Sequence, residues 1–474
     1  MKKRFKITLL ISIFSLLLFL VAFILWKTCF DPYFGVVSNF DNSQKLSAII
    51  SQEDALKDFD YAFNKLKNKH PIWLEKTEDA ENFRNLLTSK YEESKKNILE
   101  KTEFSVTELY QLVSELYAIL GDGHTKISFQ TDDILSIDNF TPLFAFGNPV
   151  AINGIDINQL YELFKSRFSF ETDISIKKFF FSSYVFREDF LSLVGIDTSN
   201  NAVYTYKSKN GYEDIVHNFV PHSESFYPNQ TDIEFFLNQR GYTDTEISNI
   251  LNISTKEYLT PDKVLYVKIG GNRDWAWYTI DSQNDIGIFT LAKCVCDNEY
   301  ISIVKDFFKE IKQSQINNVA VDLRGNGGGN SWVANEFMKH LDVESYNSWD
   351  CAIRYGPILK SYTNNYYDNQ KYDTNFQGNV YILTDTKTYS AAMDFAMLIQ
   401  DNNLGKIIGE PSSNKPESYG DILNFQLPNS KLVISISYKK WCRIDQSKKD
   451  LLIEPDFPCD GKESISELYK IIKK

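Results

Sequence analysis

Residues 384–397 read TDTKTYSAAMDFAM and place one serine, Ser390, where an apolar run gives way to a helical pattern. The preceding run, GNVYIL at 378–383, has the composition of a buried strand. A serine at such a point either caps the helix through its hydroxyl or acts as a nucleophile beside the positive dipole end of the helix. Ala391 and Ala392 favour the nucleophile, because small side chains leave the neighbouring backbone open to a substrate.

A second segment, VAVDLRGNGGGN at 319–330, brings four glycines directly after another buried strand. Glycines let backbone N–H groups turn toward a ligand, which is either a phosphate or the oxyanion of an acyl-transfer intermediate. The spacing does not meet the phosphate-binding patterns GxxxxGK[ST] and GxGxxG. The sequence therefore favours an oxyanion over a phosphate, with a turn that only packs a helix on a strand as the alternative.

In combination, VAVDLRGNGGG, TKTYSAAMDFA and GDGHT resemble the tail-specific, or carboxyl-terminal processing, serine protease family and its tricorn-like relatives. The resemblance covers residues 261–474 well and the region from GDGHT onward more loosely. It implies a serine peptidase with an α/β, crotonase/Clp-protease-like βαβ core and with no metal, nucleotide or organic cofactor. It places the nucleophile on Ser390 and the two oxyanion N–H groups on Gly328 and Ala391.

The resemblance also implies two candidates for the base. Processing-type members place a lysine 25 residues after the serine, which here is Lys415, although the surrounding GEPSSNKPESYGD departs from the family's pattern at Asn414, Pro416 and Tyr419. Tricorn-like members use a histidine, which here is His124 in GDGHT. A lysine must be buried to act as a base, whereas an imidazole titrates near pH 7 without tuning. Both candidates stay open, and the group that would orient the base is Asp122 beside His124, or Glu417 and Ser418 near Lys415.

Two other functions compete with a peptidase. The same fold serves non-proteolytic binding proteins such as retinoid carriers, so the departures around Lys415 also fit a catalytically inactive protein that binds peptides or lipids. A lipase or esterase is disfavoured, because the chain has no G-x-S-x-G elbow around Ser390.

The amino terminus predicts a membrane anchor. Four basic residues within MKKRFK precede an uncharged run, Ile7–Trp26, which is long enough to cross a bilayer as a helix. The excess of positive charge before the run predicts that the first residues stay in the cytoplasm and that the remainder lies outside it. We favour an uncleaved, single-pass anchor in the cell membrane over a signal peptide, because no A-x-A-like site follows the run.

The remaining pattern divides the chain into regions. After the anchor (1–30) we expect a tether (31–50), a helical domain (51–124), a mixed α+β region (125–260) and the catalytic core (261–474). The mixed region contains VAINGIDI, a hairpin with Asn153-Gly154 at its turn, and it resembles the hairpin of a PDZ module, which binds carboxyl-terminal peptides by strand addition. From residue 262 strand and helix patterns alternate, which is typical of a sheet built from βαβ units.

Charge limits the partners. The chain carries a net charge of −12 although Lys2, Lys3, Arg4, Lys6 and Lys27 are all basic, so the part after the anchor carries −17. Nucleic acid is therefore not an expected partner, and the expected partners are a polypeptide substrate and the membrane that holds the first helix. The six cysteines show no metal-binding spacing, and the oligomeric state is left open.

Overall fold

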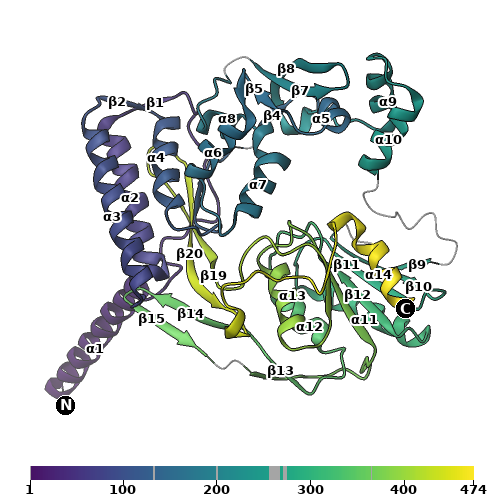
Figure 1. The fold of residues 1–474 in the computed structure, drawn as a ribbon. Coiled ribbons are helices and arrows are strands. Elements are labelled where there is room, and N and C mark those ends of the chain that lie inside the picture. Colours follow the sequence, from purple (N-terminus) through teal and green to yellow (C-terminus); the bar gives the residue numbers. More distant parts are fainter. Residues whose placement is uncertain are drawn as a thin grey trace. The chain divides into compact units, whose positions relative to one another are not determined.

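The protein is described here by a computed structural model of residues 2–131, 134–198, 201–255, 267–270, 275–363 and 366–473. The chain divides into two compact units, each assembled from three segments (Figure 1). The first unit contains residues 1–130, 351–362 and 419–440, and the second contains residues 131–350, 363–418 and 441–474. The first unit therefore extends the predicted helical domain with two segments taken from the predicted catalytic core.

Helix α1 (Lys2–Cys29) opens the first unit. Its stretch Ser12–Cys29 is long and apolar enough to cross a membrane, and it is not buried against the rest of the described chain. A single helix of this kind near the amino terminus is what either a signal anchor or a signal peptide produces.

Three further helices make up the helical part of the first unit: α2 (Gln52–Lys69), α3 (Glu78–Leu99) and α4 (Val106–Ala118). Helix α4 begins with a capping box, in which Ser105 and Glu108 each accept a hydrogen bond from the other's backbone N–H. Helix α2 ends before Pro71, and its periodic apolar residues Phe59, Phe63 and Leu66 are buried.

A small sheet completes the first unit. Its strand order is β15 (Ile358–Tyr362), β14 (Asp350–Tyr355), β20 (Val433–Cys442) and β19 (Ser418–Gln426), with β3 (Lys126–Ser128) paired to β20. The antiparallel pairing of Ile127 with Ile434 ties the chain just after GDGHT to this sheet. Strands β1 (Ile49–Ser51) and β2 (Glu103–Ser105) form a separate two-stranded sheet.

The second unit contains the predicted βαβ sheet. Its strand order is β21 (Phe457–Pro458), β18 (Lys406–Gly409), β17 (Asn379–Thr384), β12 (Asn318–Asp322), β11 (Ile286–Leu291), β10 (Ala276–Asp281) and β9 (Val267–Gly270). The pairs from β21 to β11 are parallel, and β10 and β9 are added antiparallel. The alternation predicted from residue 262 is described from residue 267 onward, where β9 begins, and its earlier residues lie outside the described ranges.

Helices cover both faces of this sheet (Figure 1). Helices α11 (Asn298–Gln313), α12 (Trp332–Met338) and α13 (Ala391–Asp401) share one core, to which β12 contributes Val319 and Val321. Ala320 points to the opposite face, where α14 (Ser464–Ile472) packs. This alternation along β12 explains its continuous apolar run, because a strand covered on both faces buries every side chain.

The mixed region of the second unit is built around another antiparallel sheet. Its strand order is β4 (Leu135–Ile137), β8 (Gly211–Pro221), β7 (Asn201–Ser208), β5 (Ala151–Ile152) and β6 (Ile155–Asp156). The predicted hairpin is confirmed, with φ of 49° at Asn153 and 74° at Gly154 as a type I′ turn requires. The remaining helices here are α5 (Thr141–Phe146), α6 (Ile157–Arg167), α7 (Asp173–Ser182), α8 (Glu188–Leu193), α9 (Gln230–Asn238) and α10 (Asp244–Thr255). A PDZ identity is not confirmed for this region.

Candidate active site

Ser390 occupies the turn between β17 and α13, as the sequence predicts. It precedes the first helical residue, yet its side chain makes no capping hydrogen bond. Its backbone has φ 54° and ψ −126°, a conformation that a residue with a side chain rarely adopts. Capping therefore does not explain this serine, and strain of this kind is concentrated at functional sites.

Three hydrogen bonds fix the strained turn. The Ser390 N–H donates to Asn414 Oδ1 over 2.8 Å, and the Ser390 carbonyl accepts from the Asp394 N–H over 2.9 Å. The Tyr389 N–H donates to the Asn326 carbonyl over 3.0 Å, which joins the turn to the glycine loop. Sequence reasoning missed Asn326 and Asn414, because nothing in their local pattern points to a residue more than twenty positions away.

The glycine loop begins where β12 ends. Arg324 forms a buried, bidentate ion pair with Asp322 and donates to the Gly461 carbonyl over 2.7 Å. The Gly325 N–H then donates to Asp385 Oδ1 over 3.0 Å, and the Thr388 hydroxyl donates to the Leu323 carbonyl over 3.0 Å. These two hydrogen bonds tie the loop to the segment just before Ser390.

Gly328 lies directly against Ser390. Its φ is 98°, and a Cβ at this position would lie 2.7 Å from Ser390 Cβ and 3.0 Å from the Ala391 nitrogen. Only glycine meets both requirements, which are the positive φ and the close approach. The loop thus leaves no room for a side chain between it and the serine.

The two predicted oxyanion donors differ in this structure. Among the residues that the structure describes, no acceptor is found for the Ala391 N–H, which stands at the free amino end of α13. The Gly328 N–H, in contrast, donates to Asn326 Oδ1 over 2.8 Å. An oxyanion at Gly328 would have to share or displace this hydrogen bond, and both assignments stay predictions.

Lys415 follows Asn414, the residue that contacts the Ser390 backbone. The Lys415 side chain is only partly buried, and its carbonyl accepts from Asn414 Nδ2 over 3.2 Å. Across the described part of the chain the Lys415 ammonium makes neither a hydrogen bond nor an ion pair. Its role as a base stays a prediction.

His124 lies in the first unit, between α4 and β3, whereas Ser390 lies in the second. The backbone N–H of His124 donates to Asp122 Oδ1 over 2.9 Å, and the ring Nδ1 of His124 lies 3.7 Å from the same oxygen. Asp122 thus holds the backbone of His124, and its role in orienting the His124 ring stays a prediction. The pairing of His124 with Ser390 stays a prediction.

The start of α7 contacts both loops that flank Ser390. The Tyr389 hydroxyl donates to the Glu171 carboxylate, with distances of 3.2 and 3.4 Å to its two oxygens. The Thr172 hydroxyl donates to the Ser413 carbonyl over 2.6 Å, and the Ser175 hydroxyl donates to the same carbonyl. The mixed region therefore supports the position of the serine turn.

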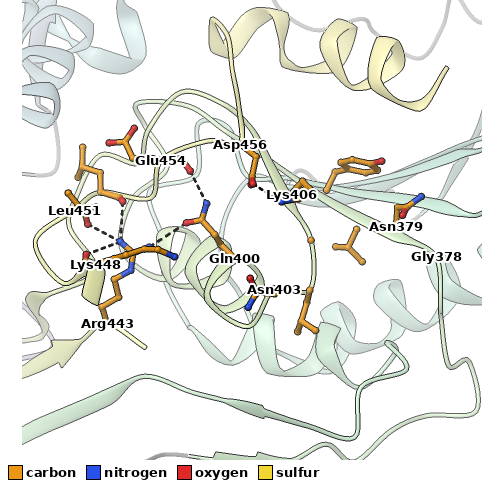
Figure 2. A pocket seen from close by; sticks show the side chains of 15 residues that line it. Gly378, Asn379, Gln400, Asn403, Lys406, Arg443, Lys448, Leu451, Glu454 and Asp456 are labelled. Atoms are coloured by element: carbon orange, nitrogen blue, oxygen red, sulfur yellow. Dashed lines mark hydrogen bonds and ion pairs between the residues drawn. The ribbon is translucent and has the colours of Figure 1, made fainter. Parts of the chain in front are cut away.

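A cavity of about 520 Å³ lies at the other end of α13, away from Ser390 (Figure 2). Its polar groups bind one another: Lys406 pairs with Asp456 over 2.9 Å, and Gln400 donates to the Glu454 carbonyl over 2.8 Å. The Arg443 guanidinium there pairs with Asp401 and donates to three backbone carbonyls. Because these groups satisfy one another, the cavity is not a candidate reaction site.

Comparison with known proteins finds a family match for the segment that holds Ser390. Residues 285–459, which include the glycine loop, Ser390 and Lys415, match the profile of peptidase family S41. The chain is similar in structure to mature CPAF complexed with lactacystin, with a TM-score of 0.59 and 12% identity over 89% of this chain and 97% of that chain. A crystal structure of mature CPAF gives a TM-score of 0.58 at 12% identity, over 89% of this chain and 96% of that chain. These identities show a shared fold, and no curated protein matches this chain in sequence.

Proposed function

Because residues 285–459 match peptidase family S41, we propose that this chain is a tail-specific serine protease, a membrane-anchored endopeptidase that cleaves polypeptides outside the cytoplasm through an acyl-enzyme at Ser390. The observation that carries the proposal is the geometry of Ser390. The residue is strained, it does not cap α13, and it lies against Gly328, where the glycine loop has no room for a side chain.

The proposed reaction uses groups of this chain alone. Ser390 Oγ attacks the scissile carbonyl while its proton passes to the base, and the carbonyl oxygen becomes an oxyanion. The Ala391 N–H and the glycine loop at Gly328 stabilise that charge, assisted by the positive end of α13. The base then protonates the leaving amine as the C–N bond breaks, and water hydrolyses the Ser390 ester by the same route in reverse.

We propose His124 as the base and keep Lys415 as the second candidate. An imidazole accepts a proton near neutral pH, and Asp122 holds the His124 backbone. A lysine base needs deep burial, whereas Lys415 is only partly buried.

Helix α1 is the proposed membrane anchor. Its unburied apolar stretch Ser12–Cys29 supports a membrane span, and the basic residues before it support an amino terminus that stays in the cytoplasm. The peptidase would then work at the outer surface of the cell membrane, on polypeptide substrates.

Labelling with a fluorophosphonate tests the function. We expect the full-length protein in detergent to be labelled and Ser390→Ala to lose labelling by about 1,000-fold or more, since the nucleophile is gone. Ser466→Ala, at an exposed serine of α14, should be labelled like the wild type. Folded wild-type protein that stays unlabelled at every pH from 5 to 10 would contradict the peptidase and favour a binding protein with the same fold.

Cleavage itself needs a second measurement. Incubation with unstructured polypeptides, followed by mass spectrometry of the products, should give internal cuts that are absent with Ser390→Ala. Labelling without any cleavage of peptide bonds would indicate an esterase rather than an endopeptidase.

A further inference from the structure

We propose that His70 and Asp122 form a buried positioning pair that holds His124 and keeps a negative charge beside its imidazole. The inference rests on the proposed function, in which His124 is the base. It adds a residue, His70, that lies 52 positions before Asp122 in the sequence and that no local pattern identifies.

Asp122 is the centre of the arrangement. Its carboxylate is completely buried, and it accepts hydrogen bonds from the His124 N–H over 2.9 Å and from the Thr125 hydroxyl over 2.5 Å. His70 Nε2 lies 3.3 Å from Asp122 Oδ2 and is equally buried. The carboxylate therefore receives hydrogen bonds from its own turn and from the end of α2.

The surroundings of His70 determine which ring nitrogen carries its proton. The Ile72 N–H donates to His70 Nδ1 over 3.3 Å, so Nδ1 is an acceptor. Nε2 then carries the proton of the neutral ring and donates it to Asp122. This tautomer holds the carboxylate without requiring a charge on His70.

Side chains from three strands of the same unit surround His70. Arg354, from β14, donates to the His70 carbonyl over 2.6 Å. The Tyr419 ring, from β19, lies 4.4 Å from the His70 ring between centroids, and its hydroxyl donates to Glu75 over 2.6 Å. Lys440, from β20, pairs with Glu75 over 2.8 Å. These groups fix the ring of His70 and leave Asp122 as the carboxylate that faces His124 within this unit.

The carboxylate stays ionised despite its burial. Burial raises the pKa of Asp122, but the hydrogen bonds from His124 and His70 outweigh burial and hold the pKa well below its usual range. A fixed negative charge 3.7 Å from His124 Nδ1 stabilises the imidazolium that forms when His124 accepts the serine proton. The same carboxylate fixes the backbone of the loop that carries the ring.

A turn alone does not account for these observations. An aspartate that accepts from the N–H two residues later is a common turn motif, and an asparagine would serve it as well. The turn requires neither a charge on Asp122 nor the buried His70 imidazole that donates to Asp122 Oδ2. Asp122→Asn therefore separates the two explanations, because it keeps the acceptor for the His124 N–H and removes the charge.

The test follows the His124 ring directly. Full-length protein in detergent with isotope-labelled histidine is titrated by NMR, and the His124 signal is identified by its loss in His124→Gln. We expect the titration midpoint of His124 to fall by about one pH unit in Asp122→Asn, because an opposite charge at this distance shifts a pKa by about one unit or more. His70→Phe should lower the midpoint in the same direction, and His70→Gln, which keeps a donor toward Asp122, should restore most of it.

Fluorophosphonate labelling on the same variants reports on catalysis. Asp122→Asn and His70→Phe should react about 10 to 100 times more slowly, with the acid limb of the pH profile moved as the NMR midpoint moves. A His124 midpoint that is unchanged in folded Asp122→Asn or His70→Phe overturns the positioning pair, whatever the labelling shows. If these variants shift the His124 midpoint but the wild type is never labelled, the result supports the positioning pair and contradicts only the proposed function.

Discussion

At the scale of single residues, the site depends on glycine at position 328. We expect Gly328→Ala to lose fluorophosphonate labelling by about 100-fold or more, because the new methyl group would push the Ser390 turn out of place. The positive φ adds a stability cost of about 1–3 kcal/mol. The labelling rate and the melting temperature of the variant measure the two effects separately.

The neighbouring glycine supplies a matched control. A Cβ added at Gly327 meets nothing within 4 Å, and this residue does not have the positive φ of Gly328. Gly327→Ala should therefore keep wild-type labelling within about threefold. Equal loss of labelling in both variants would show that general loop flexibility, rather than close packing on Ser390, is what the reaction needs.

At the scale of elements, the packing of α12 on α11 should make the stability of the second unit depend on pH. His340, just after α12, is fully buried and stacks on Phe308 of α11, with ring centroids 4.6 Å apart. Its Nδ1 lies 3.0 Å from the Thr374 hydroxyl, while its Nε2 has no hydrogen-bond partner among the described residues. Burial lowers the pKa of His340 to about 4.

The sign of the effect follows from that depressed pKa. Below pH 6.5 the unfolded chain takes up a proton on His340 that the folded chain does not, so stability falls as the pH drops from about 6.5 toward 4. At pH 5 the loss is about 2 kcal/mol relative to pH 7. We expect His340→Phe to melt with a smaller difference between pH 7 and pH 5, and the exposed His222→Gln to behave like the wild type. An unchanged difference in His340→Phe would mean that other groups control the acid sensitivity.

Elements with a strong local pattern could be predicted from the sequence. The apolar run of β12, the four glycines and the strand-to-helix change at Ser390 each lie within a few residues, so the turn that presents the serine was predictable. The sheet of the first unit was not, because β3 pairs with β20 more than 300 residues away. Lys415 lies 25 residues after Ser390, the spacing expected for a lysine base, but the residue that hydrogen-bonds to the Ser390 backbone is the adjacent Asn414. The folded loop is needed to identify this contact.

At the scale of the whole molecule, both units are assembled from separated segments of the chain. Strands β14, β19 and β20 complete the first unit, although each is encoded among segments of the second. Residues 1–130 alone would therefore lack most of the sheet on which β3 pairs. Helix α1 and the loop of His124 belong to a unit that also includes residues 351–362 and 419–440 from the carboxyl-terminal half of the chain.

We expect α1 to cross the membrane with its amino-terminal end in the cytoplasm, and cysteine labelling from one side of the membrane tests this orientation. Four basic residues precede the apolar run and only Lys27 follows it closely, so Cys29, which is exposed, should lie outside the cytoplasm. In a variant with Cys29 as its only cysteine, we expect an impermeant maleimide to react on intact cells. Lys6→Cys in a chain without other cysteines should react only after the cells are permeabilised. The reverse pattern would place the peptidase in the cytoplasm, and a purified protein whose mass lacks residues before Cys29 would identify the helix as a cleaved signal peptide.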